Sequence, residues 1–132
     1  MKSIYLGAIF ITFLTNTYAD NRIYSQKFKE CTKLAINIES HSRCMTTEIG
    51  AQKQRLNNVY KKLTGKLSKE QANHLETVQL NWLAWRDGNY NFLAEQVPGE
   101  FSTTRVTSLN FLLNAIYDRA EELEMVSDEI GK

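Results

Sequence analysis

Apolar residues recur every three or four positions along almost the whole chain beyond residue 20, and this spacing constrains the fold more than any other feature. A period near 3.6 places such residues on one face of an α-helix, whereas a half-buried strand needs strict alternation. Four segments carry the helical pattern, over residues 22–38, 43–63, 68–94 and 102–128. The single proline in 132 residues argues against a loop-rich β-sandwich. The sequence therefore predicts an all-α fold, a compact antiparallel bundle of about four helices.

Short polar or glycine-containing stretches separate the four segments. Gly65 follows the second segment, as glycine often does just beyond a helix. Ser68 and Gln71 have the spacing of a capping box and predict the start of the third helix. The stretch 39–43 consists of short polar and charged residues and is expected to form the turn between the first two helices. Residues 97–100, Val-Pro-Gly-Glu, form the clearest break before the fourth helix.

The third segment differs from the others because it is apolar on nearly every side between Val78 and Trp85. A helix of that kind must be covered by neighbours in a globular protein. We therefore expect the third helix to occupy the centre of the bundle.

The first 19 residues have the form of a secretory signal peptide. Lys2 precedes an apolar run from residue 4 to residue 14, which is too short to span a bilayer, and Ala19 suits a cleavage site. Cleavage after Ala19 predicts a periplasmic or secreted product, residues 20–132, with one domain and no membrane span. No cysteine follows the apolar run, so a lipid anchor is not expected. Without Lys2 the chain has 15 basic and 15 acidic residues, which argues against a nucleic-acid-binding face.

Cys31 and Cys44 are the only cysteines. In an oxidising compartment an isolated pair indicates a disulfide, which is expected to join the first two helices. A zinc site has little support, since it usually needs four ligands and only His41 lies between the cysteines. We expect neither a metal nor a cofactor.

No arrangement typical of catalysis is present. The sequence contains no glycine-rich phosphate loop, no His-Glu-x-x-His and no nucleophile elbow, so an enzyme is not expected. The unusual feature is Arg86, four residues beyond Trp82 and therefore on the same helix side as a core aromatic. A guanidinium there needs an acceptor, and Glu48 is the predicted partner in a polar tie that fixes the register of the bundle.

Charge is unevenly distributed along the chain. Residues 118–132 carry six acidic and two basic side chains, a net charge of −4, while residues 20–117 carry +4. A solvated helix end explains this, and a docking face for a basic partner is the alternative.

Taken together, these residues resemble the LprI-type lysozyme-inhibitor domain, a family of small exported bacterial proteins. The resemblance rests on their order and spacing over most of the chain: Cys31, Cys44, Glu48, Leu56, Asn57, Tyr60, Gln79, Trp82, Arg86, Asp87, Arg119, Ala120 and Leu123. Within this pattern Leu56, Tyr60 and Trp82 are expected to lie in the core. Members of the family usually carry a second cysteine pair, which is missing here: Tyr90 stands near one position, and residues 108–112 contain no cysteine.

The resemblance implies inhibition of lysozyme by protein–protein contact. A lysozyme cleft works with two carboxyl groups, so an inhibitor should present hydrogen-bond donors to it. We expect His41, Ser42 and Arg43 to supply these donors as an inhibitory loop, in the turn that the disulfide holds between the first two helices. Two other functions are alternatives: the chain could be a periplasmic immunity protein against an envelope-targeting toxin, or an envelope adaptor. The sequence does not specify the oligomeric state.

Overall fold

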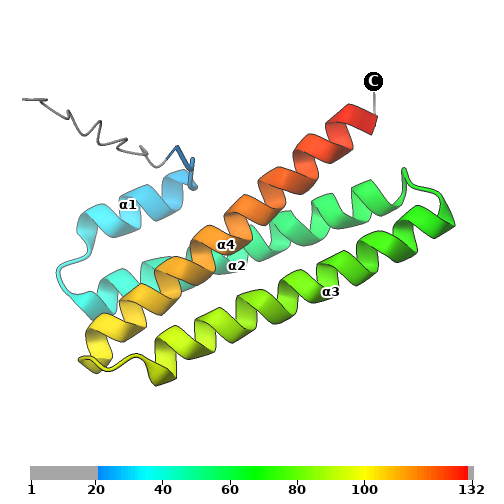
Figure 1. Cartoon of the computed structure of the whole chain (residues 1–132). Helices are drawn as coiled ribbons and strands as arrows, with labels where there is room; N and C mark the ends of the chain where they lie inside the picture. Colours follow the sequence, from blue (N-terminus) through cyan, green and yellow to red (C-terminus); the bar gives the residue numbers. More distant parts are fainter. Residues whose placement is uncertain (1–20, 131–132) are drawn as a thin grey trace, which may run out of the picture.

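The computed structural model describes residues 21–130 and shows an all-helical protein, as predicted (Figure 1). Its elements are α1 (Gln26–Leu34), α2 (Ile38–Thr64), α3 (Lys69–Asn91), the π-helical segment η1 (Phe92–Gln96) and α4 (Phe101–Ile130). Helices α2, α3 and α4 run up, down and up, so that α2 and α4 begin at the same end of the molecule (Figure 1). The predicted signal peptide, residues 1–19, lies outside the described residues.

The first two helices differ from the prediction at the connection between them. Helix α1 begins after Ser25, whose side-chain oxygen accepts a hydrogen bond from the Phe28 amide, and it ends at Leu34. Helix α2 begins at Ile38, because Asn37 and Ser40 form a capping box in which each side chain accepts a bond from the other residue's backbone N–H. The stretch 39–43 is therefore the start of α2, and the prediction of a turn there is wrong. The connection is residues 35–37.

The other helix boundaries confirm the prediction closely. Gly65 follows the last residue of α2, and its amide donates to the Lys61 carbonyl oxygen at 3.1 Å. Ser68 and Gln71 form the expected capping box at the start of α3, with side-chain to backbone distances of 3.2 Å and 2.9 Å. Residues 97–100 separate the third helix from the fourth, as predicted.

The buried core lies between α2 and α4. It consists of apolar side chains that recur at helical spacing on both helices: Met45, Ile49, Leu56, Val59 and Leu63 from α2, and Leu109, Leu113, Ile116, Ala120 and Leu123 from α4. Ile116 and Ala120 are completely inaccessible to solvent. The pairing of these two helices therefore contributes most of the hydrophobic stabilisation.

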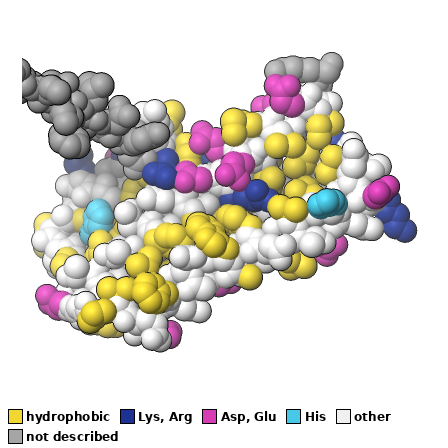
Figure 2. Space-filling model, in the orientation of Figure 1, with side chains coloured by type: hydrophobic (Ala, Val, Ile, Leu, Met, Phe, Trp, Pro, Cys, Tyr) yellow, Lys and Arg dark blue, Asp and Glu magenta, His cyan; other side chains and the backbone are white. Residues whose placement is uncertain are grey.

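Helix α3 is not central, and this prediction is wrong. It contains no buried residue, and the side chains of Leu80 and Trp85 are 59% and 53% exposed. Trp82 and Tyr90 pack partly buried against the core, while Trp85 contacts the Phe111 ring at 5.6 Å. Figure 2 shows apolar side chains on the surface over α3 and toward the end where it approaches α4. Its apolar residues are thus divided between a one-sided contact with the bundle and an exposed face.

A disulfide joins Cys31 of α1 to Cys44 of α2, as predicted, with the two Cα atoms 5.7 Å apart. Cys44 is buried at the edge of the core, so the bond holds the short α1 against the long α2. Within residues 21–130, no helix combines the length and the apolarity that crossing a bilayer requires.

Replacing both cysteines by alanine is expected to lower the free energy of unfolding by about 3 kcal/mol, since the bond closes a short loop in the unfolded chain. Urea unfolding followed by circular dichroism measures the change. Wild-type protein in reductant should lose a similar amount of stability, and an unchanged unfolding midpoint in both samples would contradict a stabilising role for the bond.

Candidate functional site

Glu48 is the most deeply buried acidic side chain in the described part of the chain, at 2% exposure. The Ser25 amide donates to one carboxylate oxygen at 3.0 Å and the Ser25 hydroxyl donates to the other. The Gln52 side-chain amide donates to the first oxygen at 2.8 Å. Glu48 therefore binds the residue that caps α1 and anchors the start of that helix on α2.

These hydrogen bonds set the ionisation of Glu48. Burial raises the pKa of the carboxyl, but the hydrogen bonds from the Ser25 hydroxyl, the Gln52 amide and the Ser25 backbone outweigh it, and the pKa lies below its ordinary value of 4.5. Glu48 is therefore a carboxylate at neutral pH. Its stabilising effect is present above the ordinary pKa and is lost as the pH falls through the lowered one.

The segment just before α1 is held on α4. Both oxygens of Asp118 accept hydrogen bonds from Arg22 at 2.7 Å. The Ile23 amide donates to the Tyr117 hydroxyl at 3.0 Å, and the Tyr24 hydroxyl donates to the Asn114 side chain. The chain preceding α1 thus bridges to the last helix, so α1 is fixed at both ends.

The predicted tie between Glu48 and Arg86 is not formed. The Arg86 guanidinium bonds Asp87, the next residue, at 2.7 Å and lies 5.2 Å from the centre of the Trp82 ring. The proximity of Arg86 to Trp82 agrees with their spacing, but Glu48 faces α1 and is occupied by Ser25. Helical spacing identified two partly or fully buried charged groups correctly, and it could not identify their partners.

A second arginine approaches the same tryptophan from α4. The Arg119 guanidinium lies 5.9 Å from the Trp82 ring centre, donates to the Gln79 side-chain oxygen at 3.0 Å and pairs with Glu122. These contacts join α3 to α4 through polar groups around one aromatic ring. As predicted, Leu56 is in the core, and Tyr60 and Trp82 pack against it.

A groove of about 460 Å³ lies between α2 and α3. Its walls include several residues on which the family resemblance rests, together with charged and apolar neighbours: Lys53, Leu56, Asn57, Tyr60, Glu76, Gln79, Leu80, Leu83 and Arg86. Two of its polar side chains already have partners beyond the lining, since Arg86 is paired with Asp87 and Gln79 is bonded to Arg119.

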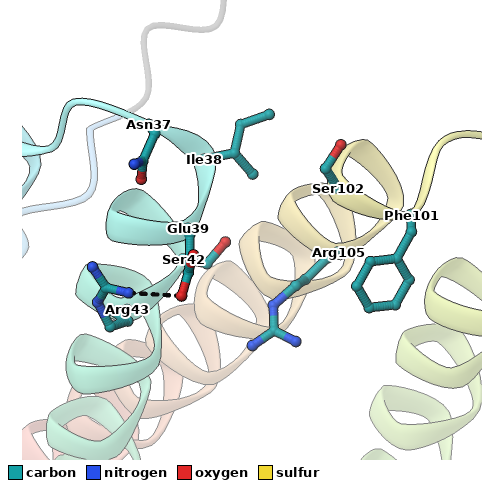
Figure 3. A pocket seen from close by; sticks show the side chains of 8 residues that line it. All are labelled: Asn37, Ile38, Glu39, Ser42, Arg43, Phe101, Ser102 and Arg105. Atoms are coloured by element: carbon teal, nitrogen blue, oxygen red, sulfur yellow. Dashed lines mark hydrogen bonds and ion pairs between the residues drawn. The ribbon is translucent and has the colours of Figure 1, made fainter.

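A larger hollow, of about 850 Å³, lies between the first turns of α2 and α4 (Figure 3). Eight residues line it: Asn37, Ile38, Glu39, Ser42 and Arg43 from the start of α2, and Phe101, Ser102 and Arg105 from the start of α4. Arg43 pairs with Glu39 at 2.9 Å along the α2 face. In Figure 3 the Ser42 side chain points from α2 toward α4, and the Arg105 side chain extends from the first turns of α4.

The hollow contains two of the three residues predicted as an inhibitory loop. Ser42 and Arg43 line it, whereas His41 does not, and all three lie in the first turns of α2 rather than on a loop. Ser42 is buried at 2% exposure and Arg43 is exposed. Sequence reasoning missed Phe101, Ser102 and Arg105, because nothing in one helix indicates which other helix begins beside it. Within residues 21–130, no three His, Cys, Asp or Glu side chains gather to hold a metal ion.

Comparison with known proteins identifies the family. The model of the family described as lysozyme inhibitor LprI matches residues 31–123, from the first cysteine of the disulfide to a core leucine of α4. The chain belongs to the LprI lysozyme-inhibitor family. The match includes both walls of the α2–α3 groove and the whole of α2 and α3. No curated protein and no solved structure matches the chain.

Replacing Glu48 by glutamine is expected to lower the free energy of unfolding by about 2 kcal/mol near pH 7, since a neutral amide cannot accept all three charge-assisted bonds. The difference from wild type should shrink as the pH falls below the ordinary carboxyl pKa, because wild type then loses its own charge. Urea unfolding over a pH series measures both effects.

Glu121→Gln is the matched control, because Glu121 is an exposed carboxylate on α4. It should change the unfolding free energy little at any pH. A Glu48→Gln variant as stable as this control at neutral pH would contradict a role for the Glu48 carboxylate in anchoring α1.

Proposed function

We propose that this LprI-family protein is an exported inhibitor of a lysozyme-type glycosidase and acts by stoichiometric protein–protein contact. The observation that carries the proposal is the match of the lysozyme-inhibitor family model over residues 31–123, which covers the disulfide, α2, α3 and most of α4. The family is one of inhibitors, so the chemistry required of this chain is recognition rather than turnover.

The physical character of the molecule supports this role. An inhibitor gains affinity when its contact surface is ordered before binding, because less conformational entropy is then lost. Here the disulfide, the Glu48 cluster and the Arg22–Asp118 pair hold the short first helix against the two long ones. The start of α2, which follows this stapled region, is thereby held in one position.

Exposed apolar side chains also support a protein partner. Phe101 is 75% exposed at the start of α4, and Ile36 and Ile38 are 92% and 47% exposed where α2 begins. Large apolar residues gathered at one end of a small protein favour contact with another macromolecule.

The proposal includes export. A disulfide persists in an oxidising compartment, and lysozymes act on the cell wall outside the cytoplasm, so both the disulfide and the family favour an exported protein. We propose that residues 1–19 are removed and that residues 20–132 form one inhibitory domain.

Adding purified protein to lysozyme in a cell-wall turbidity assay is expected to abolish lysis in proportion to the amount added, with an end point near equal molar amounts. Several classes of lysozyme should be compared, since the family match does not name one. An unrelated helical protein of similar size and charge is the control.

If every lysozyme keeps its full activity when the protein is present in molar excess over it, the proposal is refuted. Binding of an envelope-targeting toxin instead would establish an immunity protein, and capture of a non-enzymatic envelope partner would establish an adaptor.

A further inference from the structure

The hollow between the first turns of α2 and α4 carries a positive charge that has no partner. Six arginines lie within residues 21–130, and five of them pair with carboxylates: Arg22 with Asp118, Arg43 with Glu39, Arg55 with Glu124, Arg86 with Asp87 and Arg119 with Glu122. Arg105 is exposed, and in this part of the chain it has no ion pair or side-chain hydrogen bond. Its guanidinium is therefore available to an acidic group from outside.

A second unpartnered group lies in the floor of the same hollow. Ser42 is 2% exposed, and its hydroxyl oxygen is buried without a hydrogen-bond partner. Its side chain points from α2 toward α4 (Figure 3). A buried hydroxyl without a partner destabilises the folded protein, so such a group in a binding hollow points to a ligand that supplies the missing bond.

The two helix starts add to the positive potential. Helices of 27 and 30 residues begin here, and the backbone N–H groups of a first turn have no partners within their own helix. Asn37 satisfies the Ser40 amide, one of these donors, at 2.8 Å. The one carboxylate that lines the hollow, Glu39, is neutralised by Arg43. Counting Glu39, Arg43 and Arg105, the charged side chains of the hollow have a net charge of +1.

Apolar side chains flank these donors. Ile38 and Phe101 line the hollow from opposite helices and are 47% and 75% exposed. The hollow therefore combines donors for an anionic group with an apolar surface for the carbon atoms around it. Charge complementarity favours an acidic side chain on a protein surface, and such a side chain brings apolar neighbours with it.

We propose that this hollow is the inhibitory contact: it binds a carboxylate of the partner enzyme's cleft, with Arg105 as the ion-pair partner and the Ser42 hydroxyl as a hydrogen-bond donor. This inference rests on the proposed function, because a glycosidase cleft contains two carboxyl groups that an inhibitor can occupy. Ile38 and Phe101 contact the apolar surface beside that carboxylate.

The α2–α3 groove is the competing surface, and its electrostatics are less suitable. Its arginine, Arg86, is already paired with Asp87, and its remaining charges, Lys53 and Glu76, are of opposite sign. A carboxylate that paired with Arg86 in this groove would have to displace Asp87, whereas in the hollow it would meet Arg105 without a competing ion pair.

Charge reversal separates the two surfaces. Arg105→Glu is expected to weaken inhibition of the lysozyme that wild type inhibits by about 100-fold, because it replaces an attractive contact by a repulsive one. Lys53→Glu is the matched variant, an equal change of charge at an exposed residue in the α2–α3 groove, and it should leave inhibition within about threefold of wild type. An equal loss in both variants, or a loss confined to Lys53→Glu, would overturn the proposal.

Ser42→Ala distinguishes binding from folding. Removing an unpartnered buried hydroxyl should leave the urea midpoint unchanged or raise it, because no hydrogen bond within the protein is lost. Inhibition should nevertheless weaken by about tenfold, since the donor to the bound carboxylate is gone. A variant that is less stable but inhibits fully would show a structural role for the hydroxyl and contradict the proposal.

A titration that needs no enzyme keeps the two proposals separable. Hexanoate, a carboxylate on a short apolar chain, should shift the backbone amide NMR signals of Ile38, Ser42, Phe101 and Ser102 in the full chain. Hexanol should not, and Arg105→Glu should abolish the response. If wild type inhibits no lysozyme, the proposed function fails while these shifts still establish a carboxylate site; if hexanoate leaves the signals unmoved, the carboxylate site itself is refuted.

Discussion

The contact between α2 and α4 is the interaction on which the other elements depend. Their apolar stripes bury one another so completely that Ile116 and Ala120 have no exposed surface. Helix α1 attaches to this pair through Ser25, Glu48 and the disulfide, and α3 packs on its outside through partly buried side chains. Because both long helices begin at the same end, their pairing also forms the hollow at that end.

This arrangement separates charge along the molecule. The end at which α2 and α4 begin carries the unpaired Arg105 and the positive ends of two helix dipoles. The last part of α4 is acidic, and there Glu124 is tied back to α2 by Arg55, whose guanidinium also lies over the Tyr117 ring at 4.8 Å. A partner with a negatively charged cleft in a basic surface would be oriented by this separation of charge, with its cleft toward the positive end and its basic surface toward the acidic end of α4. Complementary electrostatic fields of this kind raise the association rate and favour one binding orientation.

The sequence was sufficient for what depends on local chemistry. The end of α2 at Gly65, the Ser68–Gln71 box and the disulfide follow from residue types at short spacing, and the structure confirms each of them. The predictions that failed concern one local helix start and several tertiary contacts. The capping box of α2 pairs Asn37 with Ser40, whereas the usual box has Glu or Gln at the position of Ser40. The start of this helix was therefore predicted to be a turn. Periodicity shows that Glu48 faces inward but not that Ser25 occupies it, and it cannot distinguish a central helix from an outer one with an exposed apolar face.

The peripheral position of α3 has a consequence for how the molecule opens. With no fully buried residue, α3 is joined to the rest by the contacts around Trp82 and by the partly buried side chains of Leu75 and Tyr90. The cost of detaching α3 is therefore smaller than that of separating α2 from α4. The backbone amides of α3 should exchange with solvent through a partial unfolding that leaves α1, α2 and α4 packed together. A protease would therefore cut the connection near Pro98 long before it degrades the rest of the domain.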